Sequence, residues 1–197
     1  MRPGWLRRFV VCGILVCASG LVHAKEKKTQ QNDPSSQLNE LLRSMTPIKN
    51  PASDDQIREY FQFSHVIEDY KAAWIAGVDK NRAYAQPYLP DSYWTDIKTE
   101  IQDTDLAPPF TVWFKHTVSS ELMEKVLDAY LKLGNKFPGS PMCIEIGKAQ
   151  SPMGDQWNQM SVLLARQAIA KVNATDKAKI DDARKQYAAA HPGWNEQ

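Results

Sequence analysis

The stretch from Ser119 to Phe137 constrains the fold more than any other part of the chain. Six of its apolar residues recur at offsets of 0, 4, 7, 8, 11 and 15, the spacing of one face of an α-helix; they are Leu122, Val126, Ala129, Tyr130, Leu133 and Phe137. Charged residues occupy the opposite face. The pattern predicts a helix with one packed face, and we expect Tyr130 and Leu133 to lie in the core.

The first 24 residues have the features of an export signal. Three arginines precede an apolar run at residues 9–18, which is short for a membrane span. The tripeptide Val-His-Ala at residues 22–24 is a typical cleavage site, so we expect the mature chain to begin at Lys25. We therefore predict a cleaved signal peptide over residues 1–24 and an exported protein, either periplasmic or secreted. An uncleaved anchor is the alternative.

Charge and cysteine content narrow the class of protein. The chain has 24 Lys and Arg against 23 Asp and Glu, and loss of the three signal arginines leaves it slightly acidic. This balance gives no electrostatic basis for nucleic-acid binding. Cys12 and Cys17 lie within the signal, so Cys143 is the one cysteine of the mature chain, and an internal disulfide cannot form. We interpret Cys143 as a small buried hydrophobe, with a reactive thiol as the alternative.

We predict an all-α fold, a single-domain bundle of five to six helices. Residues 25–53 are polar and contain three prolines, which indicates a flexible leader; a short docking helix within it is the alternative. Residues 54–173 are expected to form the helical core, and residues 174–197 a peripheral helix and tail. We expect Glu121–Lys136 and Ser151–Val172 to be the central helices.

Local signals place individual helices within the core. Ser53 followed by Gln56 is a capping box, and the apolar spacing after it predicts one helix from Ile57 to about Ala76. Residues 110–118 are interpreted as a helix because two prolines precede them. Short strands there and at residues 142–146 are the alternative.

Two sets of side chains are candidates for catalysis or metal binding. His65, Glu68 and Asp69 share one predicted helix, and their spacing is half of a carboxylate-bridged metal site. His116 and Glu121 are candidates for an acid–base pair at the start of a helix. The second half of such a metal site is missing, and nucleophile-elbow, P-loop, zinc-protease and C-x-x-C motifs are absent from the sequence. We predict no catalytic residue, cofactor or metal.

Tryptophan is abundant, with six residues in the sequence. Four of them fall on predicted helices: Trp74, Trp94, Trp113 and Trp157. Rings on helical faces most often pack in a core, and this is the simpler interpretation. If these four share an open groove, the groove would bind an apolar ligand, a peptide or a glycan.

A family resemblance runs through the same stretch of sequence. The residues that carry it are Ser119, Glu121, Leu122, Ala129, Tyr130, Gly134 and Lys136. They resemble a bacterial exported family of unknown function with the signature F-T-x-x-E-L…F-Y-x-S-P-x-G-x-K. Leu89–Trp94 is similar to the family's proline-initiated helix, and Asp155–Trp157 to its closing aromatic, whereas Lys132-Leu133 replaces the S-P pair. The resemblance implies a small all-helical exported domain and supplies no catalytic residues.

The sequence thus favours a non-catalytic exported helical module that binds a protein, a peptide or an envelope component. The alternative is a cryptic hydrolase or metal-dependent enzyme that uses His65, Glu68 and Asp69, or His116 and Glu121. The expected partners are an envelope protein or a peptide, with no nucleic acid and no stable membrane span after signal cleavage.

Overall fold

The computed structural model describes residues 33–136 and 154–194. The predicted signal peptide, Cys143 and the alternative strand at residues 142–146 lie outside this part of the chain. The described residues form eight α-helices and one short 3-10 helix, so the all-α prediction is confirmed and the expected number of helices was too low. In chain order the elements are α2 (Pro34–Ser44), α3 (Asp54–Ser64), α4 (Val66–Arg82), α5 (Asp91–Asp103), α6 (Ala107–Thr117), α7 (Ser120–Leu133), η1 (Gly134–Lys136), α9 (Gly154–Thr175) and α10 (Lys177–Ala190).

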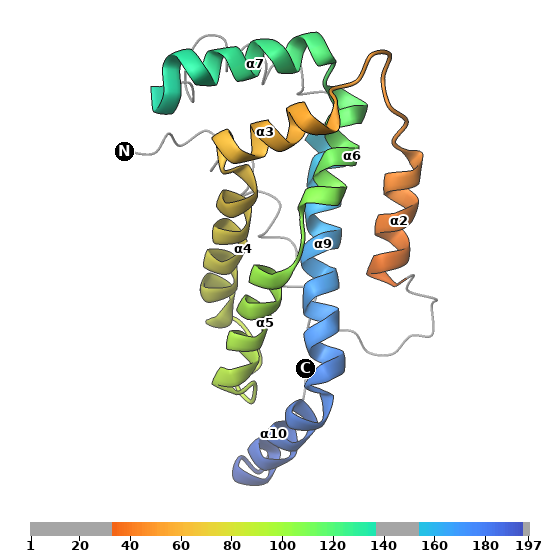
Figure 1. Ribbon diagram of the computed structural model, residues 1–197. Coiled ribbons are helices and arrows are strands. Elements are labelled where there is room, and N and C mark those ends of the chain that lie inside the picture. The colour runs from red at the N-terminus through yellow and green to blue at the C-terminus, as the bar shows by residue number, and fades with distance from the viewer. Residues whose placement is uncertain (1–32, 137–153, 195–197) are drawn as a thin grey trace.

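The helix α9 is the one on which several other helices pack. It packs against α2 on one side, α5 on another and α10 at its end (Figure 1). α4 lies against α5, while α3 and α7 pack on each other across one end of the molecule, where α6 contacts both α3 and α2. The predicted central position is therefore confirmed for α9 and wrong for α7, which packs mainly on α3.

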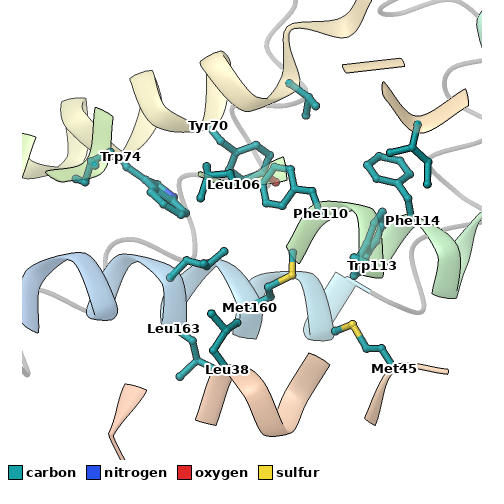
Figure 2. Packing of buried hydrophobic residues seen from close by; sticks show 14 of the residues in the cluster. Leu38, Met45, Tyr70, Trp74, Leu106, Phe110, Trp113, Phe114, Met160 and Leu163 are labelled. Carbon is teal, nitrogen blue, oxygen red and sulfur yellow. The ribbon is translucent and has the colours of Figure 1, made fainter. Parts of the chain in front are cut away.

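Buried aromatic and aliphatic side chains from α2 to α7 and from α9 form one core, and Figure 2 shows the part of it between α2, α4, α6 and α9. Leu106, Phe110 and Met160 have no exposed surface. The rings of Tyr70 and Trp157 pack on Phe110, with centroids 5.3 and 4.6 Å from it. These three rings come from helices that are far apart in the sequence, so their contact fixes how α4, α6 and α9 sit together.

The middle of the predicted flexible leader, residues 34–44, is helical. Asp33 caps α2 by accepting a hydrogen bond from the Ser36 N–H at 3.3 Å, and Pro34 occupies the first turn, where its missing N–H costs nothing. Leu38 and Met45 are buried, and α2 packs on α9. The docking helix that was the alternative for this segment is thus present in the structure.

A break at His65 divides the long helix that the apolar spacing predicted. The capping box is confirmed, since Ser53 Oγ accepts from the Gln56 N–H at 3.2 Å and the Gln56 side chain accepts from the Ser53 N–H at 3.0 Å. The single helix from Ile57 to Ala76 is wrong, because His65 has a φ of 51° and starts α4 in a new direction. The apolar spacing continues across this corner because α3 and α4 both face the core.

The last turn of α7 leaves the core. Ser119 caps the helix by accepting from the Leu122 N–H at 3.2 Å, and the buried residues of α7 end at Ala129. Tyr130 is half-buried, and Leu133 is 41% exposed, so the prediction that Leu133 is a core residue is wrong. The physical reason is that α7 is longer than α3 and extends past its end (Figure 1).

Substitutions at His65 test whether the left-handed corner is a conformational requirement. We expect His65→Gly to keep or slightly raise the free energy of unfolding, because glycine has no Cβ to clash at positive φ. His65→Val should lower it by about 1–2 kcal/mol, the cost of this conformation for a β-branched residue. Urea denaturation measures both. Gln62→Val, on the exposed side of α3, is the matched control, and equal losses for the two valine variants would contradict the prediction.

Candidate functional site

The residues of the first candidate site, His65, Glu68 and Asp69, lie at the corner between α3 and α4. All three are exposed. The spacing argument assumed that His65 is helical, and its φ of 51° removes that assumption. Across residues 33–136 and 154–194, no group of three His, Cys, Asp or Glu residues is placed to hold a metal ion.

The second candidate pair lies where α6 ends and α7 begins. His116 and Glu121 both contact the segment between α2 and α3, residues 45–52, which we call the strap. The His116 Nδ1 atom lies 2.6 Å from the carbonyl oxygen of Thr46. Glu121 Oε1 accepts a hydrogen bond from the Asn50 Nδ2 group. The two side chains therefore contact two different residues of the strap, Thr46 and Asn50.

Backbone hydrogen bonds hold the strap at the same corner. The N–H groups of Ile48 and Ala52 donate to carbonyl oxygens at the end of α6, at 3.0 and 2.9 Å. The Asn50 carbonyl accepts from the Ser120 N–H at 3.0 Å, and Asn50 itself has a φ of 55°. Helix ends leave such N–H and C=O groups without partners inside the helix. The strap supplies those partners and so joins α6 to α7.

The charge state of Glu121 fits this holding role. The pKa of its carboxyl lies below the ordinary value of 4.5, first because its own backbone N–H donates to it, then through the Ser119 hydroxyl and the Asn50 amide. A carboxylate in the first turn of a helix also faces the positive end of the helix dipole. General bases work best with a pKa near the working pH. Because its pKa is lowered, Glu121 is poorly suited to act as a general base near neutral pH.

The four tryptophans of the predicted groove come from α4, α5, α6 and α9. Trp74 and Trp113 are buried, whereas Trp94 and Trp157 are half-buried. The rings of Trp113 and Trp157 lie 4.5 Å apart, while Figure 2 shows Trp74 well away from Trp113. The structure thus brings two of the four rings together, and a groove shared by all four stays a prediction.

Two buried tyrosines make structural hydrogen bonds beside these tryptophans. Trp157 Nε1 donates to the Tyr70 hydroxyl, and burial raises the pKa of Tyr70 above its ordinary value of 10.0. The Tyr93 hydroxyl donates to Asn173 Oδ1 at 2.8 Å, and burial raises the pKa of Tyr93 to about 12. Both phenols stay neutral and tie α9 to its neighbours. The Trp113 Nε1 group is buried and has no hydrogen-bond partner within the described chain.

The sequence did not predict the contacts of the strap or the surface on which α2 packs. Asn50 followed by Pro51 is typical of a turn, because Asn tolerates positive φ. That signal gives no indication of which distant residues the turn contacts. For α2, the spacing of Leu38, Leu41 and Leu42 was the available signal, and it predicted only a short helix.

We compared the chain with models of protein families, with curated proteins and with solved structures, and none of them matches it. The resemblance to the bacterial exported family therefore stays a prediction. In the part of the chain that the structure describes, every helix is too short or too polar to cross a membrane.

Glu121→Gln tests the carboxylate that holds the strap. Since the native pKa is lowered, the carboxylate stabilises the fold above its ordinary pKa of 4.5, and this stabilisation is lost as the pH falls through the native pKa. We expect the wild type to exceed Glu121→Gln in unfolding free energy at neutral pH, and the difference to shrink at about pH 3. Urea unfolding at both pH values measures it. Glu124→Gln, on the exposed face of α7, is the matched control; a difference independent of pH would contradict the prediction.

Tyr70→Phe tests the buried hydrogen bond between α4 and α9. The variant keeps the ring but leaves Trp157 Nε1 without its acceptor, so we expect the free energy of unfolding to fall by about 1–3 kcal/mol. Tyr84→Phe is the control, because the Tyr84 side chain is 84% exposed, and it should change stability by less than about 0.5 kcal/mol. If thermal and urea unfolding show the same small effect for both variants, the hydrogen bond does not stabilise the fold.

Proposed function

We propose that this protein is a non-catalytic exported helical module that binds a protein, a peptide or an envelope component through a helical surface. One observation carries the proposal: a short amphipathic helix, α2, lies against α9 and α6. A surface that holds one such helix is suited to others with the same pattern, and a helix laid on an apolar surface is a recurring mode of peptide recognition.

The contacts of α2 resemble those of a small interface. Leu38 is buried, as is Met45 directly after the helix, and Leu41 and Leu42 pack partly buried against the core. At the edge, Gln167 Nε2 donates a hydrogen bond to the Ser35 hydroxyl at 3.1 Å. Apolar anchors in the middle and polar contacts at the rim are the usual anatomy of a protein–protein contact.

The contacts of the candidate catalytic residues support the non-catalytic part of the proposal. His116 and Glu121 hold the strap, and the pKa of Glu121 is lowered rather than raised toward neutrality. His65 occupies a left-handed corner. The alternative function, a hydrolase or metal-dependent enzyme, gains no support from these positions.

Export is also part of the proposal. It is supported by the signal-like residues 1–24, by a mature chain with one cysteine and by the resemblance to a bacterial exported family. An envelope protein or peptide is the partner class that such a location makes available.

A pull-down from the envelope fraction of the source organism tests this function. The bait is the mature chain from Lys25 onward, and an unrelated exported helical domain is the control bait. We expect the mature chain to retain a partner that the control does not, and we expect amides of α6 and α9 to exchange more slowly with deuterium when the partner is bound. Recovery of the same proteins by both baits, with no slowed amide, would contradict the proposal.

A further inference from the structure

We propose that α2 is a displaceable occupant of the surface on α6 and α9, and that the partner of this protein presents an amphipathic helix that takes its place. The proposal rests on the proposed function above, and it specifies the site, the class of partner and the regulation of that function.

The surface under α2 is apolar in the middle and polar at one edge. In Figure 2, Leu38 of α2 lies beside Met160 and Leu163 of α9, and these two α9 side chains are 0% and 3% exposed. Gln167, one turn beyond Leu163, donates to Ser35, three residues before Leu38. A helix that fits this surface therefore has a large aliphatic residue in its middle and a hydrogen-bond acceptor one turn earlier.

The pattern of α2 defines the partner more closely. Leu38, Leu41 and Leu42 stand at positions i, i+3 and i+4, so they share one face of the helix. Glu40 and Arg43, on the other side, are exposed. The chemistry that the surface selects is thus the aliphatic face of a peptide helix, recognised through anchors at these spacings.

α2 is too short to be a stable helix on its own. It has 11 residues, and isolated helices shorter than about 12–15 residues are marginal in water. Its helical state therefore depends on contact with α9 and α6. Segments of this kind open locally with less free energy than the whole protein needs to unfold.

The strap keeps a released α2 near its site. The strap is bonded to the corner of α6 and α7 through Thr46, Ile48 and Asn50, so these bonds do not depend on the contact between α2 and α9. A tethered segment competes at an effective concentration of about a millimolar. A partner binds only the open fraction, and its apparent affinity falls by that fraction. In this way α2 acts as an autoinhibitory element.

The experiment uses the mature chain and a labelled peptide of residues 33–46, acetylated and amidated. Leu38→Asp places a charge on the docked face of α2 and releases it, whereas Asn39→Asp places the same charge on the exposed face and is the matched control. We expect Leu38→Asp to bind the peptide at least about tenfold more tightly than the wild type or Asn39→Asp, because its site is open. A peptide with the same composition but with its leucines moved out of register should not bind.

Hydrogen exchange of the wild type gives an independent test. We expect amides of α2 to exchange at least about tenfold faster than those of α9, because α2 opens locally. Equal exchange in the two helices would overturn the proposal, since α2 would then leave only on global unfolding. A Leu38→Asp variant that keeps its helical circular dichroism but does not bind the peptide would also overturn it. If Leu38→Asp does not fold, Leu41→Asp, at a half-buried position, replaces it.

The pull-down separates this inference from the function on which it rests. The peptide of residues 33–46 should release the partner from the bait, and Leu38→Asp should retain more partner than Asn39→Asp. A partner that stays bound in saturating peptide would overturn the α2 site and leave the proposed function standing. Tight peptide binding with no partner recovered would instead count against the proposed function.

Discussion

The contact of Trp157 with the rings of α4 and α6 is the interaction on which the rest of the structure depends. Its centroid lies 5.1 Å from Tyr70, 4.6 Å from Phe110 and 4.5 Å from Trp113. Aromatic pairs in such tilted arrangements contribute about 0.5–1.5 kcal/mol each beyond the area they bury. Residues 33–136 and 154–194 contain no cysteine, so packing of this kind, and not a disulfide, holds the described helices in place.

In the far half of α9, polar contacts add to the packing of the buried residues Ala168 and Val172. Lys171 pairs with Glu100 of α5 at 2.7 Å, and Asn173 accepts a hydrogen bond from Tyr93. Exposed ion pairs are individually weak, but here they act on a helix that the aromatic contact has already fixed. Both ends of α9 are thereby held in place. The surface of α9 that faces α2 is therefore positioned by contacts that do not involve α2, and it forms a rigid platform. A preformed platform reduces the ordering cost of binding a helix.

Features that depend on residues close in sequence could be predicted, and those that depend on distant residues could not. The Ser53 capping box and the Ser119 cap follow from side chains three residues away, and both are present as expected. The corner at His65 has no glycine or proline to mark it, and the apolar spacing passes through it unchanged. The bond between Asn50 and Glu121 joins residues 71 positions apart. For that reason Glu121 resembled half of an acid–base pair in the sequence, although its described contact is with a turn.

The strap also limits what displacement of α2 can change. Its bonds satisfy groups at the ends of α6 and α7, and breaking them would leave those groups without partners in a partly buried corner. The contacts of α2, by contrast, are mainly apolar, and an incoming helix with the same spacing can replace them. Release of α2 as far as Thr46, the first residue of the strap that is hydrogen-bonded to α6, therefore needs less free energy than release of the strap itself. In this change α6 and α7 stay in place. Binding at this surface would expose the apolar face of α2, while the aromatic core around Trp157 stays intact.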